Sequence, residues 1–382
     1  MGRDGSSSEN EGVFHLTENL ITLAHGAGGK MSAELMHDVI GPAFSNPLLD
    51  ELHDGAKLST SGRLAFTTDS YVVRPLFFAG GNIGKLAVCG TVNDLAMTGA
   101  VPRYLSCGLI LEEGFPVADL RRIAQTMHDM AAEAGIQIVT GDTKVVERGK
   151  ADGIFINTAG VGELIDGVDI SPKNVRPGMK VLLSGFLGDH AAAILAGRHG
   201  LELPPDITTD CAPLAGLTQA VLQAAPHTAV LRDPTRGGVA AVLNEIAEAS
   251  GVGILIDEDA VPVRDAVRGV CDILGFDPLY LANEGKCIAF VPEDEADAAL
   301  AAMKSDPHGK DAVVLGETTD KAPGQVGLRP RAAAASRRRP RAASSSTMPS
   351  RRRRKPTARR TRSRSRREMA ASQARDSSRR TR

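Results

Sequence analysis

Hydrophobic positions along residues 64–161 recur with two different periods, which predicts strands interleaved with helices. Two segments carry apolar residues at helical spacing, Ile83–Met97 and Val117–Ala134, and the second is followed by Gly135, a residue type that favours a helix C-terminus. Four segments have the composition of strands: Leu64–Asp69, Tyr104–Leu111, Ile136–Val139 and Ile154–Val161. This pattern favours α/β or α+β layers over an all-helical or all-β fold.

A similar pattern resumes after Ser171–Gly178, where Pro and Gly cluster and a domain boundary is predicted. Strands are predicted at Lys180–Ser184, Gly253–Ile256, Cys287–Val291 and Ala312–Leu315, and helices at Asp189–Gly197, Leu214–Ala225 and Gly237–Ser250. The predicted fold is therefore α/β (α+β) with two domains, residues 20–170 and 171–328, each long enough to bury its own core. Residues 1–19 are predicted to be a flexible extension.

The composition changes abruptly at Arg329. Residues 329–382 hold 21 of the 45 Lys and Arg but two of the 46 Asp and Glu, which leaves a net charge of about −20 on the preceding body. Because this tail has almost no large apolar residues, it cannot offset its chain entropy by burial and is predicted to be disordered. The acidic body is typical of a soluble enzyme and argues against a nucleic-acid-binding core.

The five cysteines are scattered and form no CxxC pair, which favours free thiols in a reducing compartment. The first residues contain no apolar signal region, and no run approaches the roughly 20 apolar residues that span a membrane. We therefore expect a cytoplasmic protein without a membrane partner.

A glycine-rich turn, His25–Lys30, precedes the helical stretch Ser32–Ile40. Glycines allow backbone N–H groups to crowd against phosphate oxygens at a helix N-terminus. Ala24 and Met31 exclude a Walker A loop, and Met31 also excludes GxGxxG. The turn is either an ordinary surface turn or a phosphate site, and in the second case its ligands would come from Gly26, Gly28, Gly29 and Lys30.

Three aspartates, Asp69, Asp94 and Asp142, are predicted at strand or helix ends. Each alone is typical of a cap or a turn, but the set predicts a Mg²⁺ site, because Mg²⁺ usually takes one or two carboxylates plus substrate phosphates. The segment Asp233–Val239 places Asp233 and Thr235 at a helix entrance, where they could contact phosphate or ribose or simply form a capped turn.

Two further residues are candidate catalysts. Lys144 could neutralise charge developing on a phosphate, and Glu284 could act as a general base if burial raises its pKa. The competing interpretation of each is an ordinary salt bridge.

Taken together and in this order, these motifs resemble the HypE family of carbamoyl dehydratases, in the PurM-like ATP-binding superfamily. The resemblance covers about residues 20–328 and rests on His25–Lys30, Thr68–Ser70, Cys89–Ala100, Thr140–Val146, Asp233–Val239 and Asn283–Lys286. It implies a PurM-like fold that forms a homodimer through its N-terminal domains. It also implies that ATP and Mg²⁺ contact the glycine-rich turn, the three aspartates, Asn93 and Thr143, while Lys144 and Glu284 assist the chemistry.

The resemblance further implies a reaction and its partners. In this family, HypF places a carbamoyl group on a C-terminal cysteine, ATP phosphorylates the carboxamide oxygen, and loss of phosphate leaves a thiocyanate. The cyanide then passes to iron on the HypC–HypD complex during [NiFe]-hydrogenase maturation. This sequence departs from the family pattern because no cysteine follows Cys287. We expect a frameshift near Val326–Arg329 and an impaired self-cyanation reaction.

Two rival interpretations stay open at the level of sequence. One is another PurM-like enzyme, of the selenophosphate synthetase, thiamine-phosphate kinase or aminoimidazole ribotide synthetase type, although His25 stands where selenophosphate synthetase would need Cys or selenocysteine. The other is nucleic-acid binding through the basic tail, which would be non-specific and salt-dependent, because no aromatic residues interleave the arginines.

Overall fold

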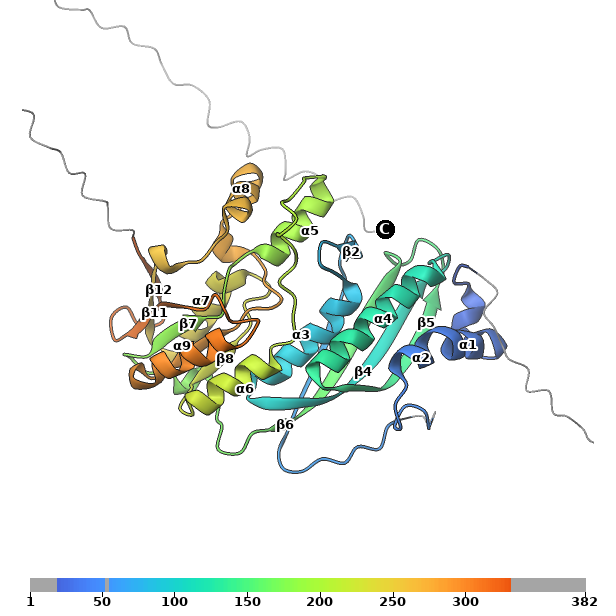
Figure 1. The fold of residues 1–382 in the computed structure, drawn as a ribbon, viewed down its shortest axis with the longest axis horizontal. Coiled ribbons are helices and arrows are strands. Elements are labelled where there is room, and N and C mark those ends of the chain that lie inside the picture. Colours follow the sequence, from blue (N-terminus) through green and yellow to red (C-terminus); the bar gives the residue numbers. More distant parts are fainter. Residues whose placement is uncertain (1–18, 52–54, 331–382) are drawn as a thin grey trace, which may run out of the picture. The chain divides into compact units, whose positions relative to one another are not determined.

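A computed structural model describes residues 19–51 and 55–330 of this chain (Figure 1). The predictions for residues 1–18 and 331–382, including most of the tail, lie outside the described residues. Arg329, predicted above to begin the tail, is instead the last residue of strand β12 (Val326–Arg329). Its guanidinium forms ion pairs with Asp257 at 2.8 Å and Glu317 at 3.0 Å, so residue 329 belongs to the folded body.

The first half of the body is a four-stranded sheet in the order β1-β6-β4-β5. Its strands are β1 (Leu64–Tyr71), β4 (Ala100–Glu112), β5 (Gln137–Val146) and β6 (Ile154–Leu164), and only the β4–β5 pair is parallel. Helices α3 (Ile83–Met97) and α4 (Val117–Ala134) cover one face of this sheet (Figure 1), and β2 (Phe77–Phe78) pairs with β3 (Gly81–Asn82) beside it.

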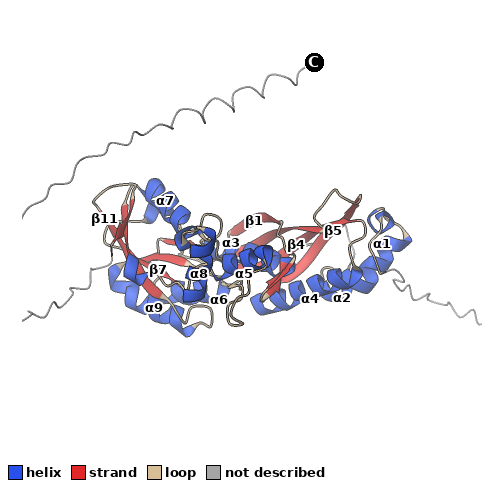
Figure 2. Ribbon diagram, turned by 90° about the horizontal axis from the view of Figure 1, so that it is seen from above, coloured by secondary structure: helices blue, strands red, loops and turns tan. Residues whose placement is uncertain are grey.

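The two faces of this sheet differ in character. Alternate residues of β1 point toward α3, and the buried Ala65 belongs to that set. The opposite face exposes large apolar side chains, with Leu64 49%, Phe66 72% and Ile110 42% exposed. We call this the open face of the N-terminal sheet; Figure 2 shows α4 and α2 (Gly41–Phe44) along the other face of β4 and β5.

The second half is built around a six-stranded sheet in the order β12-β9-β11-β7-β10-β8. The strands besides β12 are β7 (Lys180–Leu183), β8 (Val230–Arg232), β9 (Gly253–Asp257), β10 (Ile288–Val291) and β11 (Val313–Thr319). Five helices accompany them: α5 (Asp189–His199), α6 (Ala215–Ala224), α7 (Gly238–Ser250), α8 (Asp265–Leu274) and α9 (Ala296–Ser305).

The α/β layering predicted from the sequence is confirmed. Helices α3 and α4 have the predicted bounds, and Gly135 caps α4 in the left-handed region with a φ of 69°. The predicted helix at 32–40 is split into α1 (Lys30–Leu35) and a π-helical turn, η2 (Met36–Ile40), after a 3₁₀ turn, η1 (Leu23–Gly26). Helices α8 and α9 and strands β8 and β12 were not predicted. No helix in the described ranges is long and apolar enough to cross a membrane.

Candidate functional site

A cavity of about 730 Å³ collects carboxylates from four separate segments of the chain. Asp69 lies on β1 and Asp94 on α3, whereas Asp233 follows β8 and Glu284 precedes β10. We call these four residues the carboxylate cluster. Thr235 and Arg236 line the same cavity, so the structure brings together five of the predicted site residues.

Local interactions explain how these segments reach one another. Asn82 caps α3 by accepting from the N–H of Gly84 at 2.9 Å, which fixes where the helix begins. Three turns later Asp94 accepts a hydrogen bond of 3.0 Å from the hydroxyl of Thr67 on β1. In the second half, Gly238 opens α7 with a φ of 64°, and a Cβ there would stand 2.4 Å from the carbonyl oxygen of Leu279. Only glycine permits this close approach.

The carboxylate cluster is electrostatically strained. Burial and, in decreasing order, the charges of Asp210, Asp233, Asp69 and Asp94 together raise the pKa of Glu284 to about 8. Burial and the charge of Asp94 raise the pKa of Asp233 to about 6. Burial also raises the pKa of Asp94, opposed by the hydrogen bond from Thr67. Such a cluster favours a proton or a bound cation.

The glycine-rich turn lies elsewhere, against the edge strand β5. A Cβ on Gly26 would stand 2.4 Å from the backbone nitrogen of Val145, so the turn can approach β5 only because residue 26 is glycine. Gly28 and Gly29 have φ values of 83° and 79°, and the N–H of Gly28 donates to Ser32 Oγ at 2.9 Å. Lys30 begins α1 and lies 3.6 Å from Glu34.

Asp142 and Lys144 lie on β5 beside this turn, and not in the cavity of the carboxylate cluster. Lys144 Nζ pairs with Asp142 at 2.7 Å, and both side chains are more than half exposed. The hydrogen bond from Lys144 lowers the pKa of Asp142. The two residues pair in register with Gly108 and Ile110 of β4, which places them on the open face of the sheet.

The three aspartates predicted as one metal site therefore do not meet within one chain. Asp69 is on β1, one edge of the sheet, and Asp142 is on β5, the opposite edge, about 14 Å away across three strand spacings. No group of three or more His, Cys, Asp or Glu side chains in the described part of the chain forms a metal site. Of these three aspartates, Asp69 and Asp94 line the same cavity, and two carboxylates are the number that Mg²⁺ usually takes when phosphate oxygens complete its shell.

Thr143 and Asp142 line a second, mainly apolar cavity of about 210 Å³, together with Met36, Ile40 and Leu109. The N–H of Thr143 donates to Asp142 Oδ1 at 2.9 Å. The site predicted from the sequence is thus divided in two. One part is the carboxylate cluster, and the other, which we call the β5 edge, consists of Gly26, Gly28, Gly29, Lys30, Asp142, Thr143 and Lys144.

The structure does not support the predicted nucleotide contact of Asn93. Its side chain is 1% exposed, and its amide donates to the carbonyl oxygens of Ala212 at 3.0 Å and Glu284 at 3.3 Å. It also accepts from the N–H of Leu214 at 2.7 Å. Asn93 therefore ties α3 to two loops of the second half, one of which carries Glu284.

Several residues of the cavity were missed by sequence reasoning, among them Tyr71, His190, Arg198 and Tyr280. The Tyr71 hydroxyl lies 3.1 Å from Thr91 Oγ1, and a Cβ on Gly90 would stand 2.4 Å from it. None of these residues lies in a recognisable motif. Tyr71 alone carried a signal, because it is two positions after Asp69 and shares its side of β1.

Comparison with known proteins matches both halves of the body to the same protein family. Residues 52–164 match the family model of AIR synthase related proteins, N-terminal domain, and residues 176–329 match the C-terminal domain. Carbamoyl dehydratase HypE of Rhodobacter capsulatus is 52% identical over 317 residues, 82% of this chain and 93% of that relative.

Two solved structures extend the comparison. A crystal structure of the hydrogenase maturation protein HypE in complex with ATP has a TM-score of 0.78 at 49% identity, over 80% of this chain and 93% of that one. A HypE–HypF complex has a TM-score of 0.68 at 49% identity, over 77% and 95%. On this identity and coverage, the chain belongs to the HypE family of AIR synthase related proteins.

Proposed function

We propose that this chain is an ATP-dependent carbamoyl dehydratase that converts a carbamoyl group on a cysteine thiol into a thiocyanate. The observation that carries the proposal is the burial of Glu284 among Asp69, Asp94 and Asp233, in a cavity large enough for a nucleotide phosphate and a small acyl group. A carboxyl with a pKa near 8 can accept and release a proton at neutral pH. The relatives named carbamoyl dehydratase and the ATP complex support this activity.

One group of residues would bind the nucleotide. Asp69 and Asp94 would hold Mg²⁺, whose chemistry is to neutralise the phosphate oxygens of ATP. Thr235 and Arg236, at the entrance of α7, would contact the same phosphates. The apolar cavity beside Thr143 has the size and lining that suit a nucleotide base.

The reaction balances with one proton acceptor used twice. The carbamoyl oxygen attacks the γ-phosphorus of ATP, ADP leaves, and the nitrogen loses its first proton. The C–O bond then breaks, phosphate leaves with the bonding electrons, and the nitrogen loses its second proton as the C≡N bond forms. Glu284 would accept each proton in turn and release the first to water before the second step, and Lys144 would stabilise charge on the departing phosphate.

For Lys144 to act there, it must come from a second copy of the chain. Lys144 and Asp142 lie on the open face, which also exposes Leu64, Phe66 and Ile110. An exposed apolar sheet face of this kind is typical of an interface. A homodimer that buries both open faces would bring the β5 edge of one copy to the β1 edge of its partner, and so complete two shared sites.

Mixing inactive variants tests this arrangement. Lys144→Ala and Glu284→Gln are each expected to lower ADP formation with ATP, Mg²⁺ and a carbamoylated cysteine peptide at least about 100-fold. After denaturation and refolding as a 1:1 mixture, half of the dimers would be mixed and would hold one intact site, so about one quarter of the parent rate should return. No recovery in a confirmed mixed dimer would refute the shared site.

The substrate is tested in the same assay. ATP turnover that depends on selenide or thiamine phosphate, and not on the thiocarbamate, would favour the rival PurM-like activities. For the partners, HypF would supply the carbamoyl group and HypC–HypD would accept the cyanide, in the cytoplasm. The solved HypE–HypF complex supports the first of these, and binding of HypF to this chain can be measured by calorimetry.

A further inference from the structure

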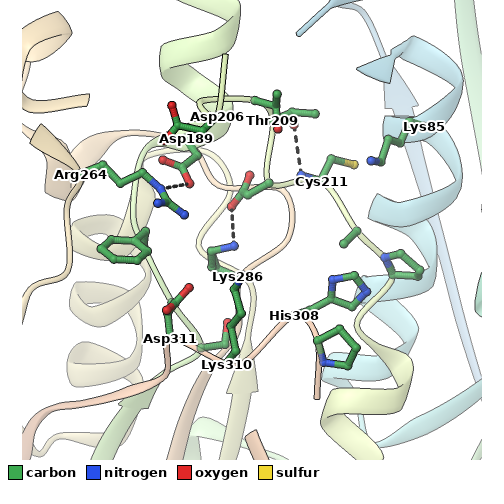
Figure 3. Close-up of a pocket in the computed structure, with 18 of the residues that line it drawn as sticks. Lys85, Asp189, Asp206, Thr209, Cys211, Arg264, Lys286, His308, Lys310 and Asp311 are labelled. Carbon is green, nitrogen blue, oxygen red and sulfur yellow. Dashed lines mark hydrogen bonds and ion pairs between the residues drawn. The ribbon is translucent and has the colours of Figure 1, made fainter. Parts of the chain in front are cut away.

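A third cavity, of about 310 Å³, is lined by Lys286, which follows Glu284 by two residues (Figure 3). Lys286 and Arg264 reach into it from different segments of the chain, and each meets an aspartate. Lys286 Nζ lies 3.3 Å from Asp210 Oδ2, with the two side chains 11% and 3% exposed. Arg264 Nε lies 3.1 Å from Asp189 Oδ2.

The Asp210–Lys286 pair contacts the Glu284 loop on both sides of Gly285. Asp210 Oδ1 accepts a hydrogen bond of 3.1 Å from the backbone N–H of Glu284. Lys286 Nζ donates to the carbonyl oxygen of Gly285 at 3.1 Å. A Cβ on Gly285 would stand 1.8 Å from the carbonyl oxygen of Asp210, so the two segments touch through their backbones as well.

The rest of the loop is fixed by other buried groups. The side chain of Asn283, 0% exposed, donates to the carbonyl oxygens of Pro234 at 3.1 Å and Leu281 at 2.9 Å. Asn93 donates to the carbonyl oxygen of Glu284, as described above. The side chain of Asp210 accepts the hydrogen bond of the Glu284 backbone N–H through Oδ1, and Lys286 Nζ lies 3.3 Å from its other oxygen.

We propose that Asp210 and Lys286 are positioning residues for the reaction, and that their buried ion pair holds the Glu284 loop so that its carboxyl faces Asp94 and Asp233. This inference rests on the proposed role of Glu284. Neither residue lines the cavity of the carboxylate cluster in the described chain, so neither touches the substrate. They act through Glu284, where a displacement of about 1 Å can lower a rate about 100-fold.

The charges around Glu284 are consistent with this role. Carboxylates face it from β1 (Asp69), from α3 (Asp94), from the segment after β8 (Asp233) and from Asp210 itself. Among these four carboxylates, Asp210 has the largest effect on the pKa of Glu284. Because Lys286 is paired with Asp210, no full unpaired charge lies there beside the loop.

Four substitutions separate the contribution of the Lys286 cation from that of the Asp210 oxygen that accepts from the Glu284 N–H. Lys286→Met removes the cation, and Lys286→Arg restores a cation with a longer reach. Asp210→Asn keeps an oxygen that can accept from the Glu284 N–H, whereas Asp210→Ala removes it. Arg264→Met is the matched control, because it breaks the other ion pair of the same cavity without touching the Glu284 loop.

The first readout is steady-state ADP formation with ATP, Mg²⁺ and a carbamoylated cysteine peptide. We expect Lys286→Met and Asp210→Ala to lower kcat about 10- to 100-fold, with the KM for ATP unchanged within about 3-fold. For Lys286→Arg and Asp210→Asn, the decrease in log kcat should be at most half of the decrease in Lys286→Met and Asp210→Ala. The kcat of Arg264→Met should stay within about 3-fold of the parent value. An unchanged kcat in Lys286→Met would overturn the proposal.

The second readout does not need turnover. Hydrogen exchange of a peptide that spans residues 280–290 should become at least about 10-fold faster in Asp210→Ala, and stay unchanged in Arg264→Met. If the parent chain forms no product from the thiocarbamate, the proposed function fails, while the exchange result still decides whether Asp210 holds the loop. Equal exchange in Asp210→Ala and the parent would exclude a positioning role.

Discussion

Thr67 on β1 donates its hydroxyl to the carboxylate of Asp94 on α3, across 3.0 Å. This bond joins the sheet to its covering helix at the point where the carboxylate cluster forms. It favours the ionised form of Asp94 and so opposes the burial that raises its pKa. Thr67, which lies outside every recognised motif, thus influences the charge of Asp94, which lies within one.

Replacing Thr67 with Val should therefore weaken the binding of Mg²⁺·ATP. Without the hydroxyl, the pKa of Asp94 rises further, and its carboxylate is free to turn away from the cavity. We expect the dissociation constant to rise about 3- to 10-fold at pH 7, and by less at higher pH, because higher pH favours the ionised Asp94 carboxylate in both proteins. Calorimetric titration measures this. Thr228→Val, which changes a buried threonine that does not line the cavity, should leave the affinity unchanged.

Glu284→Gln should stabilise the chain at alkaline pH. Below about pH 4.5 the Glu284 carboxyl is protonated in both the folded and the unfolded chain, and it adds no penalty. Between about pH 4.5 and 8 it is ionised only when unfolded, because its folded pKa is about 8, so stability falls as pH rises through this window. The Gln variant lacks this loss.

Calorimetry in EDTA without nucleotide should show equal Tm values near pH 5, and a Tm roughly 3–8 °C higher for the variant at pH 8.5. Glu317→Gln is the control of opposite sign. Hydrogen bonds from Lys180 and Arg329 lower the pKa of Glu317, so its loss should lower the Tm at pH 8.5. A Tm difference for Glu284→Gln that does not grow with pH would contradict the raised pKa.

The carboxylate cluster could be predicted from the sequence in part because its members follow regular elements. Asp94 falls on a helix whose bounds were predicted correctly, and Asp69 falls on a strand. Asp142 was grouped with them because it occurs in a similar local sequence. Its strand was predicted to end at Val139, so no face of the sheet could be assigned to it. The longer β5 places it on the open face, by period-two alternation.

Other parts of the site had no signal in the sequence. Asp210 lies in an irregular segment between α5 and α6, and its contact with Glu284 joins residues 74 positions apart. The contact of Asn93 with the nucleotide was predicted only from the family resemblance, and one residue along a helix turns a side chain by about 100° from that of Asp94. That rotation points Asn93 into the packing between α3 and the second half.

The glycines of the turn should differ in what they tolerate. Alanine at residue 26 would place its Cβ against the backbone of β5, so the turn must move, and we expect a loss of roughly 2–4 kcal/mol in unfolding free energy. Alanine at residue 28 meets no atom within 4 Å and bears only the strain of its positive φ, about 1 kcal/mol. Urea unfolding distinguishes them, and equal losses would contradict the close approach of Gly26 to Val145.

The five cysteines should not accept a carbamoyl group in the folded chain. All of them lie among the described residues and are buried, with Cys89 and Cys287 0% exposed. Burial raises the pKa of Cys107 to about 12, which keeps its thiol protonated and unreactive. Intact-mass analysis after incubation with HypF, ATP and carbamoyl phosphate should therefore show no adduct.

The control is the same chain unfolded in guanidinium chloride. All five thiols should then react with a disulfide reagent, whereas in the native state fewer than about one thiol per chain should react. If that contrast holds, the dehydration assay requires a carbamoylated thiol added in trans, as the peptide experiments above supply it. A stable carbamoyl or cyano adduct on any of these cysteines in the native chain would instead show that one of the buried thiols becomes accessible to HypF.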